Sequence, residues 1–233
     1  MDVRGARVLI AGAAGHLGSV LAWRLSRRGA AVAVAGRGPG DLTRVARACA
    51  GAPSHALDAY DLGSCGRLVK WAADEHGGLD AVVVCVGVAA FEPADTLGDA
   101  VAEHLITVNT LAPLAFLRAS LPLLAPGGMI AAITGVVAQA APGGTADHAA
   151  PKAALAAWLS AVRREQTPSG VKVLEIRLPH VETGFASRAD AGAAPPLPPG
   201  LPAATAVEAI VDAMSADARL VKPGRTGTLD ITV

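Results

Sequence analysis

Three glycines near the start of the chain have the spacing of a phosphate-binding turn. Gly12, Gly15 and Gly18 follow the first apolar run and lead into a helical stretch. Glycine suits positions where the backbone takes a positive φ or must approach a phosphate closely. The free N–H groups and the dipole of a helix N-terminus attract the same anion. The spacing predicts that this turn, with His16 and Leu17, binds a nucleotide; a tight turn without a ligand is the alternative.

The residues after the next two apolar runs indicate which nucleotide. A carboxylate after the second run would bind the ribose 2′-hydroxyl of NAD. Here the run ends in Arg37, whose charge and planar fork suit a 2′-phosphate, so NADP(H) is favoured over NAD(H). His16 is a second candidate contact to that phosphate, or a solvated loop histidine. Asp58, after the third run, is a candidate acceptor for the adenine amino group, or a cap of the next turn.

The elements that must position these residues are short apolar runs alternating with helical stretches. The predicted strands cover residues 7–11, 31–35, 54–57, 81–86, 129–134, 171–177 and 228–233. The predicted helices cover residues 17–28, 41–50, 64–76, 95–124, 147–166 and 203–215, with Pro113 and Pro122 limiting or kinking the fourth. Apolar strands that alternate with helices predict an α/β fold, a three-layer doubly wound parallel sheet of about seven strands.

One segment differs in composition from the rest of the chain. Residues 191–202 read AGAAPPLPPGLP, a proline-rich sequence that disfavours a helix. Such a segment is either a surface connection or a lid over a ligand. We find no domain boundary there, and we expect residues 1–233 to form a single nucleotide-binding domain.

Composition limits the classes of partner. The 233 residues include 20 basic and 20 acidic side chains, and 52% are hydrophobic. This balance gives no electrostatic case for nucleic acid or an anionic membrane surface. The apolar runs are too short to predict a membrane span. Three scattered cysteines predict neither a disulfide framework nor a metal site, so we expect a reduced, cytoplasmic protein that binds a small-molecule substrate.

The order of these motifs resembles the short-chain dehydrogenase/reductase family over nearly the whole chain. Asp58 stands at the family's adenine-contacting aspartate, and Asn109 at its helix-four asparagine. Lys152 matches the lysine of the YxxxK motif, and Thr183 matches the threonine that contacts the nicotinamide carboxamide. The resemblance implies a Rossmann fold and a nicotinamide cofactor. It also implies a homodimer or homotetramer joined through the helices 95–124 and 147–166, where Trp158 and Leu159 are candidate contacts or core residues.

The chain departs from the family where proton transfer takes place. The tyrosine position is His148, and the serine position, thirteen residues earlier, is Gly135. The family's NNAG segment reads Val84-Cys85-Val86-Gly87, in which Gly87 remains a candidate cofactor contact. Thr134 is the hydroxyl nearest the missing serine, but a strand would point it to the opposite face from residue 135.

Two histidines are candidates for the missing chemistry. His148 and Lys152, at i and i+4, share one helix face, and imidazole can act as an acid or base near neutral pH. A nearby ammonium would favour the neutral ring, which still carries one donor N–H. His180, after the sixth strand, either faces the same pocket or is a loop residue bonded to backbone. The candidate catalytic set is therefore His148, Lys152, Asn109 and His180.

These observations leave three functions open. The first is an NADP(H)-dependent oxidoreductase acting on a small hydrophobic carbonyl or alcohol, with His148 in place of tyrosine. The second is a non-redox enzyme, such as a dehydratase, isomerase or cyclase, on the same scaffold. The third is a catalytically silent protein that binds a nucleotide or a partner.

Overall fold

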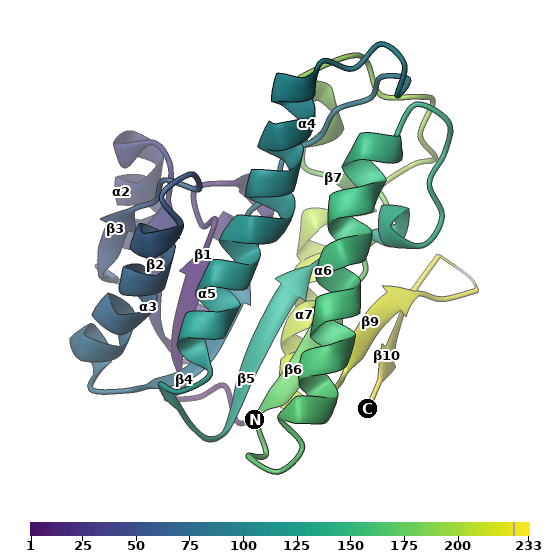
Figure 1. The fold of residues 1–233 in the computed structure, drawn as a ribbon. Helices are drawn as coiled ribbons and strands as arrows, with labels where there is room; N and C mark the ends of the chain where they lie inside the picture. Colours follow the sequence, from purple (N-terminus) through teal and green to yellow (C-terminus); the bar gives the residue numbers. More distant parts are fainter. Residues whose placement is uncertain (226) are drawn as a thin grey trace.

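A single eight-stranded sheet organises the chain, whose computed structural model describes residues 1–225 and 227–233 (Figure 1). The strand order is β10-β9-β6-β5-β4-β1-β2-β3. The strands are β1 (Arg7–Ala11), β2 (Ala31–Gly36), β3 (Ser54–Ala56), β4 (Leu79–Val84), β5 (Leu124–Ile133), β6 (Lys172–Ile176), β9 (Leu220–Pro223) and β10 (Leu229–Thr232). Neighbours pair in parallel except β9 and β10, which pair antiparallel.

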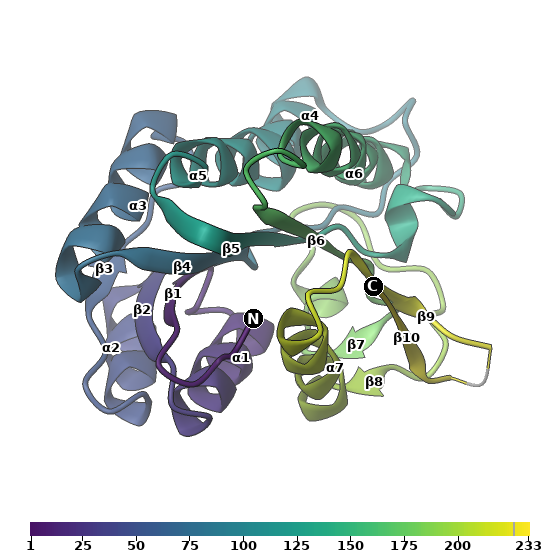
Figure 2. The same cartoon turned by 90° about the horizontal axis from the view of Figure 1, so that it is seen from below.

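Helices cover both faces of this sheet and complete three layers. They are α1 (His16–Arg27), α2 (Pro39–Ala48), α3 (Leu62–His76), α4 (Asp99–Ile106), α5 (Ala112–Ser120), α6 (Ala146–Glu165) and α7 (Ala203–Ser215). Figure 2 shows α1, α2 and α7 on one side of the sheet and α3, α5 and α6 on the other. The predicted doubly wound α/β fold is confirmed.

The apolar runs become strands because both faces of the sheet are buried. Along β1, Val8 and Ile10 join the core under α1 and α7, while Leu9 and Ala11 join the core under α3, α5 and α6. Side chains of a strand point alternately to its two faces, so a strand covered on both sides must be apolar throughout.

The direction in which successive strands are added to the sheet reverses between β1 and β4, and a ligand is expected at this point. From β1 the chain adds β2 and β3 outward, then returns to place β4 against the other edge of β1. In open α/β sheets, ligands bind beyond the carboxyl ends of the strands at such a reversal.

The predicted helix 95–124 is shorter and interrupted. It runs from Asp99 to Ser120, with the π-helical turn Thr107–Leu111 between α4 and α5. Pro122, which lacks an N–H, follows its end, and Pro113 lies in the first turn of α5. This helix is long enough to cross a membrane and contains an 18-residue stretch with a mean hydropathy of 1.4. However, 44% of that stretch is buried within the fold. Burial of that kind is ordinary for a helix packed on a sheet, and the expectation of no membrane partner stays a prediction.

Other differences from the sequence predictions lie at the carboxyl side. β9 was not predicted, because its four residues include a lysine and a proline. The proline-rich segment 191–202 is mostly irregular, and only its end forms β8 (Leu201–Pro202), which pairs with β7 (Val181–Glu182). Leu159 is fully buried in the core and Trp158 packs against that core, so Leu159 is not a surface contact.

Candidate active site

The glycine turn after β1 leaves no room for larger residues. Gly12 has a φ of +90°, and a Cβ there would lie 2.8 Å from the carbonyl carbon of Cys85. A Cβ on Gly18 would overlap the carbonyl oxygen of Gly12, and one on Gly15 would lie 3.3 Å from the same oxygen. The turn is therefore packed tightly between the ends of β1 and β4, and α1 starts immediately beyond it.

The first turn of α1 is open to an anion. Its N-cap is Gly15, no side chain caps it, and no acidic residue lies in its first turn. His16 and Leu17 are the first two helical residues, and His16 is exposed. Backbone N–H groups at such a terminus bind phosphate, so the close-packed glycines and this helix end fit the pyrophosphate of a dinucleotide.

The adenosine side of the crevice is formed by the ends of β2 and β3. Gly36 ends β2 against Ala14, whose Cβ would lie 2.8 Å from any Cβ at position 36. Arg37 follows and is exposed. Asp58, after β3, is also exposed, and its Oδ1 accepts a hydrogen bond of 2.9 Å from the N–H of Tyr60. Asp58 thus caps its own turn, which is the alternative to a contact with adenine. Its second carboxylate oxygen forms no hydrogen bond with the described residues.

Asn109 fixes the segment after β4. Its Oδ1 accepts from the N–H of Val88 and its Nδ2 donates to the Val88 carbonyl, both at 3.0 Å and fully buried. The π-helical turn that carries Asn109 interrupts α4–α5, and such turns are frequent at functional sites. With these two hydrogen bonds to Val88, the Asn109 amide holds the backbone beside Gly87 in place.

Lys152 lies on the other side of Gly87. A Cβ on Gly87 would be 3.0 Å from the Lys152 Nζ and 3.1 Å from the Asn109 Oδ1, so both polar groups meet there. Nζ donates to the Ile133 carbonyl at 3.2 Å. Burial lowers the pKa of Lys152 to about 8. The same burial raises the pKa of Cys85 to about 12, so the thiol stays protonated at neutral pH.

His148 occupies an aromatic niche one turn before Lys152. The side chain is only 7% exposed, and its ring centroid lies 5.9 Å from that of Phe91 and 6.2 Å from that of Phe185. Burial, aided by the Lys152 ammonium, lowers the pKa of His148 to about 4. The ring is therefore neutral near pH 7, and its buried Nδ1 has no recorded hydrogen-bond partner among the described residues.

Neither residue 134 nor residue 135 supplies the hydroxyl of the missing serine. Gly135 takes a φ of +80°, a conformation that strains a residue with a side chain. Thr134 is buried, and its Oγ1 donates to the Glu175 Oε1 at 2.9 Å. Arg177 also donates to that oxygen at 2.8 Å, so Thr134 serves a buried ion pair and is not available to a substrate.

His180 and Thr183 lie in the segment after β6. The His180 Nδ1 is 3.0 Å from the Pro198 carbonyl, which is the backbone-bonded alternative for this residue. Within residues 1–225 and 227–233, no hydrogen bond or ring contact joins His180 to His148. Thr183 lies at the end of β7, where its Oγ1 accepts from the Phe185 N–H at 3.3 Å. His180 instead borders a cavity of about 430 Å³ that is lined mainly by alanine and glycine of residues 184–197.

A short strap of backbone hydrogen bonds joins the segment of Phe91, which packs on His148, to the loop after β7. The Phe91 N–H donates to the Ala191 carbonyl at 2.9 Å, and the Asp190 N–H donates to the Ala89 carbonyl at 2.8 Å. Gly192 forms a parallel bridge with Phe91 at a φ of +65°, and a Cβ there would overlap the Phe91 carbonyl oxygen. The sequence did not reveal this strap or the place of Phe185, because both depend on pairing between distant segments.

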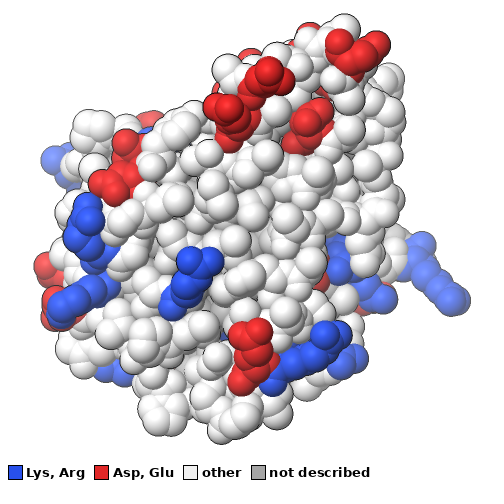
Figure 3. Space-filling view, viewed as in Figure 1, with Lys and Arg blue, Asp and Glu red and all other residues white. Residues whose placement is uncertain are grey.

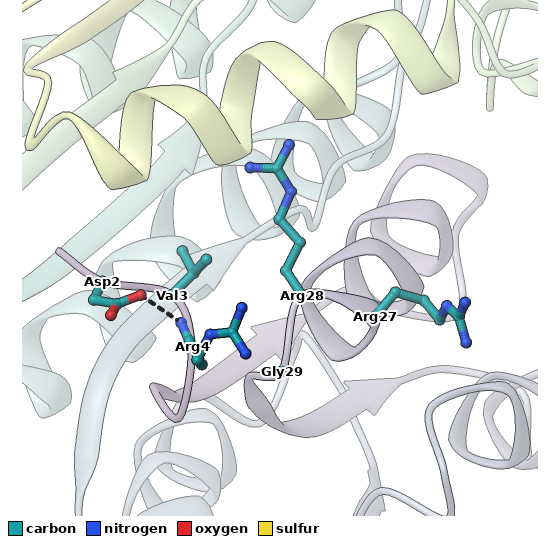
Figure 4. A pocket seen from close by; sticks show the side chains of 6 residues that line it. All are labelled: Asp2, Val3, Arg4, Arg27, Arg28 and Gly29. Carbon is teal, nitrogen blue, oxygen red and sulfur yellow. Dashed lines mark hydrogen bonds between the residues drawn. The ribbon is translucent and has the colours of Figure 1, made fainter.

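A second depression lies away from these residues. It measures about 410 Å³ and is lined by Asp2, Val3, Arg4, Arg27, Arg28 and Gly29, at the amino end of β1 (Figure 4). Its arginines are partly neutralised, since Arg28 pairs with Glu208 at 2.8 Å. Among the described residues, no three His, Cys, Asp or Glu side chains are arranged to hold a metal ion.

Known proteins are similar to this chain in sequence and in fold. A curated relative from Anopheles gambiae, a dehydrogenase/reductase SDR family protein 7-like, is 28% identical over 201 residues, which are 82% of this chain but 63% of that protein's length. A short-chain dehydrogenase/reductase from Serratia marcescens is 25% identical with a TM-score of 0.75, covering 82% of this chain and 80% of that one. A short chain dehydrogenase from Burkholderia cenocepacia, solved in complex with NADP, is 24% identical with a TM-score of 0.81, covering 91% of both chains.

The family comparison extends over most of the sequence. The short chain dehydrogenase profile matches residues 6–193, from the strand before the glycine turn to the strap. The matched range contains Lys152 and Asn109 as well as the substituted positions Gly135 and His148. With its parallel sheet, glycine turn and buried lysine on α6, the chain belongs to the short-chain dehydrogenase/reductase family.

Proposed function

We propose that this protein is an NADP(H)-dependent oxidoreductase that acts on a small hydrophobic carbonyl or alcohol. The observation that carries the proposal is the glycine turn: a Cβ would collide at Gly12 and Gly18 and be tightly placed at Gly15, and α1 begins there uncapped. Natural chains keep such a crowded, side-chain-free turn where backbone must approach a pyrophosphate. The NADP complex of the Burkholderia relative is consistent with the same cofactor class.

The residues present suit a nicotinamide dinucleotide at every part of the crevice. The turn and the first residues of α1, His16 and Leu17, would hold the pyrophosphate. Arg37 would pair with the 2′-phosphate, and Asp58 would accept from the adenine amino group. Gly87, Lys152 and Thr183 would surround the ribose and nicotinamide. When bound, the cofactor supplies hydride chemistry.

His148 would orient the substrate oxygen. At neutral pH it is an uncharged imidazole with one N–H donor, and its Nδ1 is unpaired in a niche walled by Phe91 and Phe185. A neutral ring of this pKa hydrogen-bonds to a carbonyl but is not the proton reservoir at pH 7. Lys152, whose pKa is about 8, would hold the proton that a reduced carbonyl oxygen needs and exchange it with solvent.

Calorimetric titration with NADPH and NADH tests the cofactor. We expect tighter binding of NADPH, weakened roughly tenfold or more by Arg37→Ala because a charge-assisted phosphate contact is lost. Arg47→Ala, which removes another exposed arginine from α2, is the matched control and should bind NADPH like the parent. Equal affinity for both nucleotides would exclude the assigned role of Arg37, and binding of neither would remove the oxidoreductase proposal.

One observation favours a second candidate, a non-redox enzyme on the same scaffold. Gly135 and His148 replace the family's serine and tyrosine, and Gly135 adopts a backbone conformation unsuited to serine. A dehydratase, isomerase or cyclase would form product at the same rate after the nucleotide is removed. A redox enzyme would instead oxidise NADPH in equal amount to the carbonyl reduced.

A further inference from the structure

A series of hydrogen bonds through Tyr60, His104 and Asp190 connects the turn after β3 with the loop beside His148. The hydroxyl of Tyr60, after β3, contacts the Nδ1 of His104 on α4. The Nε2 of His104 lies 3.2 Å from the Oδ2 of Asp190, in the loop after β7. The Asp190 N–H in turn donates to the Ala89 carbonyl at 2.8 Å. Three segments far apart in sequence are thus joined through one imidazole.

The chemistry of the partners sets the direction of each hydrogen bond. An ionised carboxylate only accepts, so the His104 Nε2 carries the hydrogen and donates to Asp190. In that neutral tautomer Nδ1 is an acceptor, and the Tyr60 O–H donates to it. The Tyr60 ring also stacks on the imidazole, with centroids 5.7 Å apart and an interplanar angle of 23°. Every polar atom of the His104 ring is therefore satisfied in a single arrangement.

Each end of this series of hydrogen bonds lies beside a part of the proposed site. At one end, the Tyr60 N–H donates to the Oδ1 of Asp58 at 2.9 Å, so the position of Tyr60 depends on the Asp58 side chain. At the other end, Asp190 is two residues before Gly192, which bridges to Phe91 above His148. The loop from Thr183 to Pro202 is rich in proline and glycine, is mostly irregular and has no buried side chain, so few contacts hold it in place.

We propose that His104 is a positioning residue that holds the loop 183–202 closed over His148, and that Tyr60 transmits nucleotide binding at Asp58 to this closure. The first half stands on the contacts alone, and the second rests on the proposed function. A nucleotide that engages Asp58 orders the turn Asp58–Tyr60, and an ordered Tyr60 hydroxyl keeps His104 in the tautomer that donates to Asp190. Substrate would enter with the loop open and react with it closed.

Hydrogen exchange of the strap amides tests closure without nucleotide. We expect His104→Ala to speed exchange of the Asp190 and Phe91 amides about fivefold, the loss of roughly one partly exposed hydrogen bond. Glu103→Ala, at the exposed neighbouring position on α4, is the matched control and should leave both amides unchanged. The Thr134 amide, bonded to the Ile176 carbonyl at 2.9 Å, reports global stability and should not respond. Unchanged exchange at Asp190 and Phe91 in His104→Ala would overturn the closure role.

Two further measurements separate positioning from a general structural effect. The ¹⁵N spectrum of His104 should show a protonated Nε2 and an acceptor Nδ1, and Asp190→Ala should change that tautomer balance. His104→Ala combined with Asp190→Ala should exchange no faster than either single variant, because both remove one interaction. Additive effects would contradict the linkage.

Nucleotide coupling is tested with Tyr60→Phe, which keeps the ring and removes only the hydroxyl. In the parent protein, NADPH should slow exchange of the Asp190 amide. In Tyr60→Phe we expect NADPH affinity within about threefold of the parent but at most half of that added protection. Full protection in Tyr60→Phe would refute the coupling while leaving the cofactor proposal intact. Failure of the parent to bind NADPH would refute the cofactor proposal and the coupling, whereas closure would still be decided by the nucleotide-free experiment.

Discussion

Burial decides the chemical character of His148. The ring lies between two phenylalanines and one helical turn from a buried ammonium, so its charged form is unfavourable. A histidine in the place of a tyrosine therefore retains a hydrogen-bond donor but not an acid that is populated at neutral pH. Gly135 contributes no hydroxyl, and Thr134 is bonded to Glu175. Under the proposed function, polarisation of a substrate oxygen would therefore fall to His148 and Lys152.

The same burial predicts a pH dependence of stability. The pKa of His148 falls from 6.5 in the unfolded chain to about 4 in the fold, so the unfolded chain binds more protons between these values. Stability from this group is complete above pH 6.5 and is lost as the pH falls toward 4, by about 3 kcal/mol at most. Urea unfolding of His148→Phe, which cannot titrate, should lose correspondingly less stability across this range. Parallel pH profiles for parent and variant would contradict the assignment.

At the scale of elements, a π-helical turn and one asparagine position the loop after β4. Thr107–Leu111 interrupts α4–α5, and Asn109 within it pairs with the N–H and the carbonyl of Val88. The turn is also tied to α6, because the Thr110 Oγ1 donates to the Pro151 carbonyl at 2.8 Å, between His148 and Lys152. The niche of His148 and the backbone at Gly87 are thus fixed by the same irregular turn.

Removal of the Asn109 amide should be costly for this reason. Asn109→Ala leaves the buried N–H and carbonyl of Val88 unpaired, and we expect about 2–4 kcal/mol of destabilisation. Ser120→Ala, which removes a buried hydroxyl bonded to the Leu117 carbonyl of its own helix, is the comparison and should cost less than about 1.5 kcal/mol. Chemical denaturation measures both. Equal losses would show that Asn109 has no special part in holding the loop.

The sequence predicted those elements whose signal is local. Strands β1 and β2 are predicted because, apart from the leading Arg7, all their residues are apolar, and α1 is predicted because it follows the glycine turn. β9 was missed because four residues with a lysine and a proline give no apolar run. In the site, Lys152 and His148 could be located from their helical spacing. The strap at Phe91 and Gly192 and the Tyr60–His104–Asp190 chain could not, because tertiary packing alone brings them together.

Across the whole molecule, charge is unevenly distributed over the surface. On the face shown in Figure 3, acidic side chains gather at the end where α4 begins, and a broad uncharged area lies below them. Apolar side chains are exposed along this helix, with Ile106 at 49% and Leu111 at 40% exposure. We propose that this face joins two copies of the chain, although Leu159 itself lies in the core.

A charge at the centre of that face should separate the copies. Ile106→Glu would place an uncompensated carboxylate in an apolar contact, and we expect a monomer where the parent is a dimer or tetramer. Trp23→Glu, on α1 at the opposite face of the sheet, removes an equally exposed apolar side chain and should leave the assembly intact. Sedimentation velocity distinguishes these species. If the parent protein sediments as a monomer, the proposed interface is wrong.

The glycine at position 192 has a consequence for how this protein could acquire new substrates. The Gly192 backbone lies against Phe91 with no space for a side chain. Any larger residue at position 192 would therefore break the bridge between the two loops. The span that follows, from Ala193 to Leu197, borders a cavity of about 430 Å³. Insertions and substitutions that adapt the enzyme to larger molecules should therefore accumulate in this span, while 190–192 stays constant as its anchor.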